Sequence, residues 1–102
     1  MPEKPWKRAE REVAKRLGGV RVKRHGEPAP DVVSEWCVAE VKTRRHLPEW
    51  IISALFGVVR QTPSHKLPIL ILKDLTTHDV LWVIRERDGL DSFGPVAAKR
   101  EK

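Results

Sequence analysis

The segment from Glu49 to Gln61 constrains the fold more than any other part of the chain, because apolar side chains surround the helix that it is expected to form. Pro48 is placed to start this helix, and Gly57 is its single weak helix former. Between Trp50 and Val59 the one polar residue is Ser53. A helix that is apolar on every face must be covered from two sides. We expect a sheet on one side, and either a second copy of the chain or its own C-terminal segment on the other.

The rest of the chain divides into short elements with few breaks. Pro5 and the Gly18-Gly19 pair delimit a first helix, and runs rich in β-branched residues follow. This pattern predicts an α/β fold with a mixed central sheet flanked by helices. We expect one domain over residues 1–102, with a charged, loosely ordered tail from about residue 88. The expected elements are a helix over 5–17, strands over 20–24, 31–34 and 36–43, a helix over 49–61, and strands over 67–73 and 80–87.

The chain is basic, and its charge is unevenly distributed. It has 20 Lys and Arg against 14 Asp and Glu, a net charge of +6. Residues 1–45 contain twelve basic and seven acidic residues, so they carry nearly all of the excess. Clustered positive charge on folded elements favours a polyanionic partner, and the alternative is a solvated basic surface.

Several classes of protein are disfavoured by what the sequence lacks. The longest apolar stretch has ten residues, against about 20 needed to span a bilayer. The first residues show no apolar segment typical of a signal peptide. Cys37 is the single cysteine, which excludes an intrachain disulfide and a cysteine-based zinc site. We therefore expect a cytoplasmic protein, of cellular or phage origin, with no membrane partner and no small-molecule cofactor.

Glu10 is out of place in the first helix. It lies one helical turn after Trp6 and on the apolar stripe that continues through Val13 and Leu17. A carboxylate at such a position is costly unless a cation, a metal ion or hydrogen-bond donors meet it. We identify Glu10 as a candidate functional acid, and the alternative is a partly exposed glutamate at the edge of the stripe.

A second group of charged residues lies in the two strands expected to form a hairpin. Glu40 and Lys42 are two residues apart, so they share one face of a strand whose neighbours are apolar. Antiparallel pairing of 31–34 with 36–43 would bring Asp31 towards Glu40. Two adjacent carboxylates repel each other unless a divalent cation neutralises them. Oxygen ligands favour Mg²⁺ or Mn²⁺, and Lys42 could orient water or stabilise charge on a phosphate.

These residues resemble the signature of the PD-(D/E)xK nuclease superfamily, in which an aspartate precedes an acid-x-lysine triplet. Here Asp31 is followed nine residues later by Glu40-Val41-Lys42. The helix containing Ala9-Glu10-Arg11-Glu12, followed by Gly18-Gly19-Val20-Arg21-Val22, resembles the start of archaeal-type Holliday junction resolvases. The resemblance implies a restriction-endonuclease-like αβββαβ core, Mg²⁺ dependence with Mn²⁺ as a substitute, and a homodimer that cuts four-way DNA junctions by paired nicks.

The resemblance also assigns roles to individual residues. Asp31 and Glu40 would be metal ligands, Lys42 the catalytic lysine, Glu10 an acid that assists the metal site, and Arg24 a contact to DNA phosphate. The alternatives are a nuclease of the same chemistry that acts on nicked, flapped or duplex DNA, and a non-catalytic DNA-binding module of the same fold. The basic residues expected to contact DNA are Lys7, Arg11, Lys23, Arg24, His25, Arg44 and Arg45.

Overall fold

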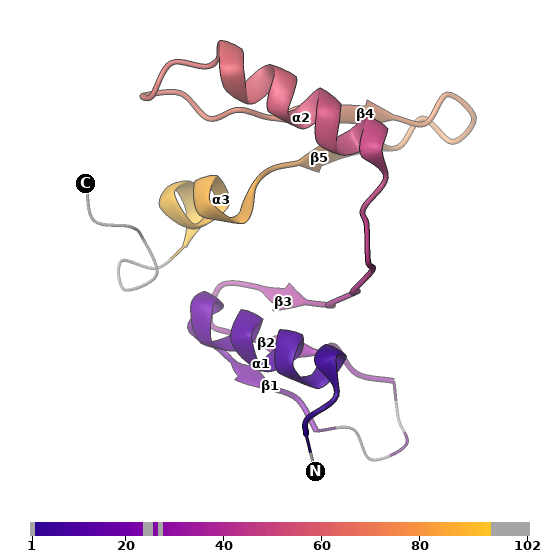
Figure 1. Ribbon diagram of the computed structural model, residues 1–102, viewed down its shortest axis with the longest axis vertical. Helices are drawn as coiled ribbons and strands as arrows, with labels where there is room; N and C mark the ends of the chain where they lie inside the picture. The colour runs from indigo at the N-terminus through magenta and orange to yellow at the C-terminus, as the bar shows by residue number, and fades with distance from the viewer. Residues whose placement is uncertain (1, 24–25, 27, 95–102) are drawn as a thin grey trace.

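The structure, a computed structural model, describes residues 2–23, 26 and 28–94. It is a mixed α/β arrangement of helices and small antiparallel sheets (Figure 1). Arg24 and His25, two of the residues expected to contact DNA, lie outside the described residues. In chain order the elements are α1 (Pro5–Leu17), β1 (Val20–Arg21), β2 (Val32–Val33), β3 (Val38–Ala39), α2 (Glu49–Gln61), β4 (Leu70–Lys73), β5 (Val80–Val83) and α3 (Glu86–Phe93).

Helix α1 has the bounds expected from the sequence. Pro5 occupies its first turn, where the missing N–H costs nothing. Gly18 ends the helix in the left-handed conformation, with φ of 72°. Gly19 then brings the chain close to β2, since a Cβ at this position would lie 2.3 Å from the carbonyl oxygen of Val33. The two glycines therefore have different roles: one ends the helix, and the other allows α1 to lie directly against the sheet.

Strands β1, β2 and β3 form an antiparallel sheet in chain order. Val32 pairs with Ala39 in the register, so Asp31 stands opposite Glu40 at the end of the ladder. The Asp31 N–H donates to the Ala39 carbonyl at 3.1 Å. In the turn, Ser34 Oγ accepts a hydrogen bond from the Cys37 N–H at 3.1 Å. The predicted hairpin is confirmed, although each regular strand is shorter than expected.

Helix α2 and the hairpin of β4 and β5 form the second half of the chain. The bounds of α2 are those predicted, and its N-cap is Pro48. Along β4, half-buried residues alternate with exposed ones, and α2 contacts this strand. In the turn between β4 and β5, backbone hydrogen bonds from Thr77 and Thr76 lower the pKa of the Asp74 carboxyl. Across the described part of the chain, none of the helices is long and apolar enough to cross a membrane.

The single mixed sheet expected from the sequence is not formed by the described residues. Strands β1–β3 and the β4–β5 pair are separate sheets, and every pairing is antiparallel. The segment from Glu40 to Pro48 contains no strand and leads away from the first sheet to α2 (Figure 1). The radius of gyration is 15.7 Å, against about 13 Å for a compact chain of this length. The two halves are therefore arranged openly, and each small sheet has a helix of its own.

The end of the described chain also differs from expectation. The strand predicted over 80–87 ends at Val83, and α3 follows where a loose tail was expected. Glu86 and Asp88 lie in the first turn of α3, where acidic side chains stabilise the helix dipole. Leu90 is buried, and the Arg16 guanidinium of α1 contacts both carboxylate oxygens of Glu86 at 3.0 Å. Helix α3 thus connects the two halves, and the remainder of the expected tail, 95–102, lies outside the described residues.

The close approach at Gly19 gives a prediction about stability. Gly19→Ala places a methyl group against the backbone of β2, so we expect a loss of about 1–3 kcal/mol in the free energy of unfolding. The matched control is Gly89→Ala in α3, where nothing lies within 4 Å of the added Cβ. That change should stabilise by up to about 1 kcal/mol. Urea denaturation followed by circular dichroism measures both, and equal effects would contradict the proposed role of Gly19.

Candidate functional site

A pocket of about 610 Å³ opens between the N-terminal part of α1 and the ends of the first sheet. It gathers residues from four separate segments of the chain: the first turns of α1, β1 and the residues after it, the residue before β2, and the residues that follow β3. Both acidic and basic side chains contribute, and one aromatic ring lies beside them. The lining residues are Trp6, Glu10, Arg21, Val22, Lys23, Asp31, Val41, Lys42, Thr43 and Arg44.

Glu10 is buried at the back of this pocket. It is 7% exposed, so the prediction that it lies on the buried face of α1 is confirmed, and the alternative of an exposed edge position is wrong. Its Oε2 lies 3.6 Å from the Arg21 Nε. Within the described part of the chain, neither of these two atoms has a hydrogen-bond partner. A buried carboxylate oxygen without a donor costs free energy, and the ion pair with Arg21 at 3.6 Å offsets that cost only in part.

Asp31 is the second carboxylate of the pocket, and it is 5% exposed. The backbone of the hairpin holds it in place. Its Oδ2 accepts a hydrogen bond of 2.6 Å from the Val41 N–H, across the end of the ladder. The predicted antiparallel pairing fixes Asp31 at the point where β2 begins, but Asp31 and Glu40 line different pockets and do not meet in one site as expected.

Glu40 and Lys42 have different positions from those expected. Regular pairing of β3 ends at Ala39, and both side chains are largely exposed, at 61% and 67%, instead of embedded in a half-buried strand. The Lys42 Nζ lies 3.8 Å from Glu40 Oε2. Lys42 lines the pocket with Glu10 and Asp31, whereas Glu40 lines a neighbouring pocket beside Pro30. The physical reason is that β3 is an edge strand, and the chain leaves the sheet immediately after it.

The expected three-carboxylate set is consequently incomplete. In the described residues, no group of three or more His, Cys, Asp or Glu side chains is close enough to hold a metal ion. Glu10 and Asp31 nevertheless face one pocket, and one buried oxygen lacks a donor. Mg²⁺ commonly binds through one or two carboxylates and keeps several waters, so this donor set fits such an ion.

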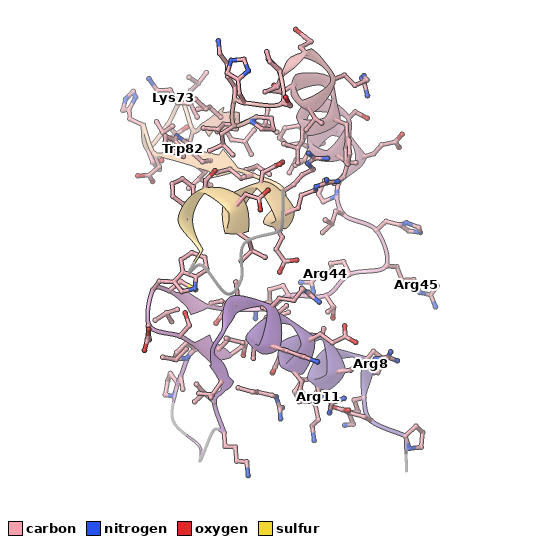
Figure 2. The ribbon with its side chains drawn as sticks, turned by 90° about the vertical axis from the view of Figure 1, so that its left-hand side faces the viewer. Arg8, Arg11, Arg44, Arg45, Lys73 and Trp82 are labelled. Atoms are coloured by element: carbon pink, nitrogen blue, oxygen red, sulfur yellow. The ribbon has the colours of Figure 1, made fainter. Side chains whose placement is uncertain are left out.

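Basic side chains surround the two acids. Lys23 and Arg44, both expected to contact DNA, line the pocket, and Lys7 lies beside it on α1. Figure 2 shows Arg11 on α1 and Arg44 and Arg45 on the segment that leaves β3, all in the same half of the molecule. Arg11 also forms an ion pair with Glu3. The lining of the pocket therefore contains both cationic side chains and two carboxylates.

One charged and one aromatic residue of the pocket were not among the sequence candidates. In the sequence nothing distinguishes Arg21 from the other basic residues, except that its alternation with Val20 and Val22 indicates that it points to one face of the strand. Trp6 reads as part of the apolar stripe of α1, but it is 45% exposed at the edge of the pocket. The sequence signal for this exposure is the place of Trp6 at the start of the helix, because the first turn extends beyond the sheet.

Comparison of the chain with protein-family models, with curated proteins and with solved structures finds no match. The interpretation of this pocket therefore depends on its residues and their geometry.

The two carboxylates give a prediction about cation binding. Mg²⁺ at about 100 times its dissociation constant should stabilise the wild-type chain by about 2.7 kcal/mol, because the ion binds the folded state. Glu10→Gln removes the charge but keeps the shape of the side chain, so the shift in thermal midpoint should disappear. The matched control is Glu35→Gln, an exposed acid of the same half that does not line the pocket. Scanning fluorimetry with and without EDTA measures the shifts, and an unchanged shift in Glu10→Gln would exclude this site.

Proposed function

We propose that the protein is a metal-dependent DNA endonuclease that hydrolyses phosphodiester bonds in the pocket of Glu10 and Asp31. The observation that carries the proposal is the buried Oε2 of Glu10, which lacks a donor and shares with Asp31 a pocket otherwise rich in cations. A phosphate is attracted by the cations and repelled by the two carboxylates. A divalent cation between them removes the repulsion, which is the requirement of phosphoryl-transfer sites.

Each residue then has a role that follows from its place. Glu10 and Asp31 would hold Mg²⁺ through carboxylate oxygens, and Glu40 is the third ligand that the nuclease resemblance implies. When bound, Mg²⁺ acidifies a water molecule and reduces the negative charge of the phosphate. Lys42 lines the same pocket, where its ammonium group could orient water or stabilise charge on phosphorus. Arg21 would hold the Glu10 carboxylate in place through their ion pair at 3.6 Å.

The order of the elements supports a restriction-endonuclease-like core. Helix α1, strands β1–β3, helix α2 and strand β4 follow one another as in the αβββαβ order that the resemblance implies. The functional acids also have matching places, one on the first helix and one at the start of the second strand. In the described residues β4 pairs with β5. The common features are therefore the order of the elements and the hairpin that positions Asp31.

The basic surface around the pocket suits the DNA backbone. Lys23, Lys42 and Arg44 line the pocket, and Arg45 follows on the same exposed segment. Contacts of this kind go to phosphates and do not identify bases. Binding should therefore tolerate many sequences and weaken as salt increases. Selection of a substrate by structure, with a four-way junction as the proposed substrate, is consistent with such contacts.

A homodimer would supply the two sites needed for paired nicks. On α2 the exposed residues recur at helical spacing on the side away from β4, with Trp50 and Phe56 on either side of Ser53. Trp50 is 63% exposed and Leu55 is the one buried residue of this helix. We propose that this stripe packs against the same stripe of a second copy. The two pockets would then be related by a twofold axis, as are the two cut strands of a junction.

The assignment of the pocket predicts how variants behave. Asp31→Asn and Lys42→Ala should each lower the rate of Mg²⁺-dependent cleavage by at least about 100-fold, with DNA binding largely retained. Glu40→Ala should have the same effect if it completes the metal site. The matched control is Lys66→Ala, an exposed lysine of the second half that should cleave like wild type.

The substrate is tested by offering a four-way junction, a flap and a linear duplex in parallel, with Mg²⁺ or with EDTA. Symmetric nicking of the junction alone is the expected result. Equal cleavage of all three would indicate a nuclease of wider substrate range. Cleavage in EDTA, or full activity of Asp31→Asn, would exclude the proposed site.

The dimer is tested independently of cleavage. Light scattering should give about twice the chain mass of 11.7 kDa for the wild type. Ser53→Arg places two like charges against each other at the twofold axis, so this variant should be monomeric. Leu75→Arg is the matched control, because Leu75 is the most exposed large apolar residue and lies in the β4–β5 turn. A wild-type monomer would contradict the paired-nick mechanism.

A further inference from the structure

Trp6 is an exposed aromatic ring at the edge of a strongly charged pocket. It lies in the first turn of α1, one helical turn before Glu10, and both residues line the pocket. The ring is 45% exposed, whereas Glu10 and Ala14, further along the same helix, are buried. Large apolar residues are exposed elsewhere on the described surface too, so what distinguishes Trp6 is its place in the lining of a charged pocket. An aromatic ring in that position can contact a flat, partly apolar ligand.

Two cations accompany this ring. The Lys7 Nζ lies 5.4 Å from the ring centroid, and the Arg21 guanidinium carbon lies 6.0 Å from it. The same Arg21 has its Nε 3.6 Å from the buried Glu10 carboxylate. The ring, the guanidinium and the candidate metal-binding acid are therefore consecutive neighbours. A nucleotide has the matching parts, with a flat base beside a charged phosphate.

A base can stack on this ring only if one of its faces is accessible, and this differs between kinds of DNA. Inside a duplex both faces of each base are covered by neighbouring base pairs, so an indole at the surface finds no free face. An unpaired base offers its face, and stacking on an aromatic side chain is insensitive to sequence. The combination of an exposed ring and phosphate-attracting cations is the pattern of single-strand binding sites.

We propose that Trp6 stacks on an unpaired base of the substrate, with the adjoining phosphate placed at Glu10 and Asp31. The inference depends on the proposed function for the identity of the substrate as DNA, and it adds that the bound nucleotide is unpaired and adjoins a duplex, as where the arms of a junction open at the branch point or at the base of a flap. Trp6 is then a positioning and selectivity residue. Lys7 and Arg21 hold the phosphates on either side of the stacked base.

The proposal is tested by binding in EDTA, where no metal-dependent cleavage interferes. Fluorescence anisotropy compares a labelled oligothymidine with a blunt duplex of the same length, for the wild type, Trp6→Ala, Trp6→Phe and Phe93→Ala. Trp6→Ala should weaken binding of oligothymidine by about 5- to 100-fold and change duplex binding by less than about twofold. Trp6→Phe should retain most of the affinity, since a smaller aromatic ring still stacks. Phe93→Ala is the matched control, because Phe93 is an exposed aromatic residue that does not line the pocket.

The outcomes separate this inference from the proposed function. If Trp6→Ala binds oligothymidine like the wild type, or loses duplex binding equally, the stacking role is wrong whatever the nuclease assays show. If oligothymidine binding is lost selectively and is rescued by Trp6→Phe, the stacking role is supported even where the wild type cleaves no DNA. Circular dichroism of each variant excludes unfolding as the cause, and a folded Trp6→Phe with the affinity of Trp6→Ala would also overturn the proposal.

Discussion

Glu10 and Arg21 face each other beneath α1, and the other features of the pocket are arranged around this pair. The Oε2 to Nε distance of 3.6 Å leaves both buried atoms without a hydrogen bond. Removal of two charges from water is expensive, and an ion pair offsets that cost only when its hydrogen bonds are complete. Replacement of such a pair by apolar residues of similar volume is often neutral or stabilising, so the pair by itself is weak evidence for stability. Its place in the lining of the pocket is what makes it a candidate for ligand binding.

The pair can be buried only because α1 lies very close to the sheet. Gly19 provides this approach, since any side chain there would meet the backbone of β2. Ala14, a small buried residue one turn after Glu10, serves the same packing from the helix side. The hairpin then determines where the second acid lies, because the Val41 N–H holds Asp31 at the same end of the sheet. Two small residues and one backbone hydrogen bond thus place both carboxylates in one pocket.

The sequence predicted correctly those features of the fold that depend on residues close together in the chain. The bounds of α1 and α2 follow from prolines, glycines and helical spacing, and the burial of Glu10 follows from its position on the helix. The hairpin that positions Asp31 was predicted from strand pattern alone. The joining of strands into sheets depends on long-range contacts, and the predicted mixed sheet is wrong for that reason. Helix α3 was missed because Gly89 within it and Gly94 at its C-cap are typical of loops, although its acidic first turn favours a helix.

The candidate site residues divide in the same way, into those predicted from local sequence and those whose positions depend on long-range contacts. The exposure of Trp6 and of Glu40 depends on where the sheet ends, and a sequence pattern does not show where that end lies. Trp6 extends beyond the sheet at one end of α1, and Glu40 follows the last paired residue of β3. Trp6 therefore lies at the exposed edge of the pocket, and Glu40 lies at a neighbouring pocket, while Glu10 and Asp31 are buried. A polymer with an exposed base and a charged backbone can contact the open side through the ring and the buried side through a cation. The proposed nucleotide-binding site therefore combines an aromatic residue at the exposed edge of the pocket with the buried acid Glu10, whose ion-pair partner is Arg21.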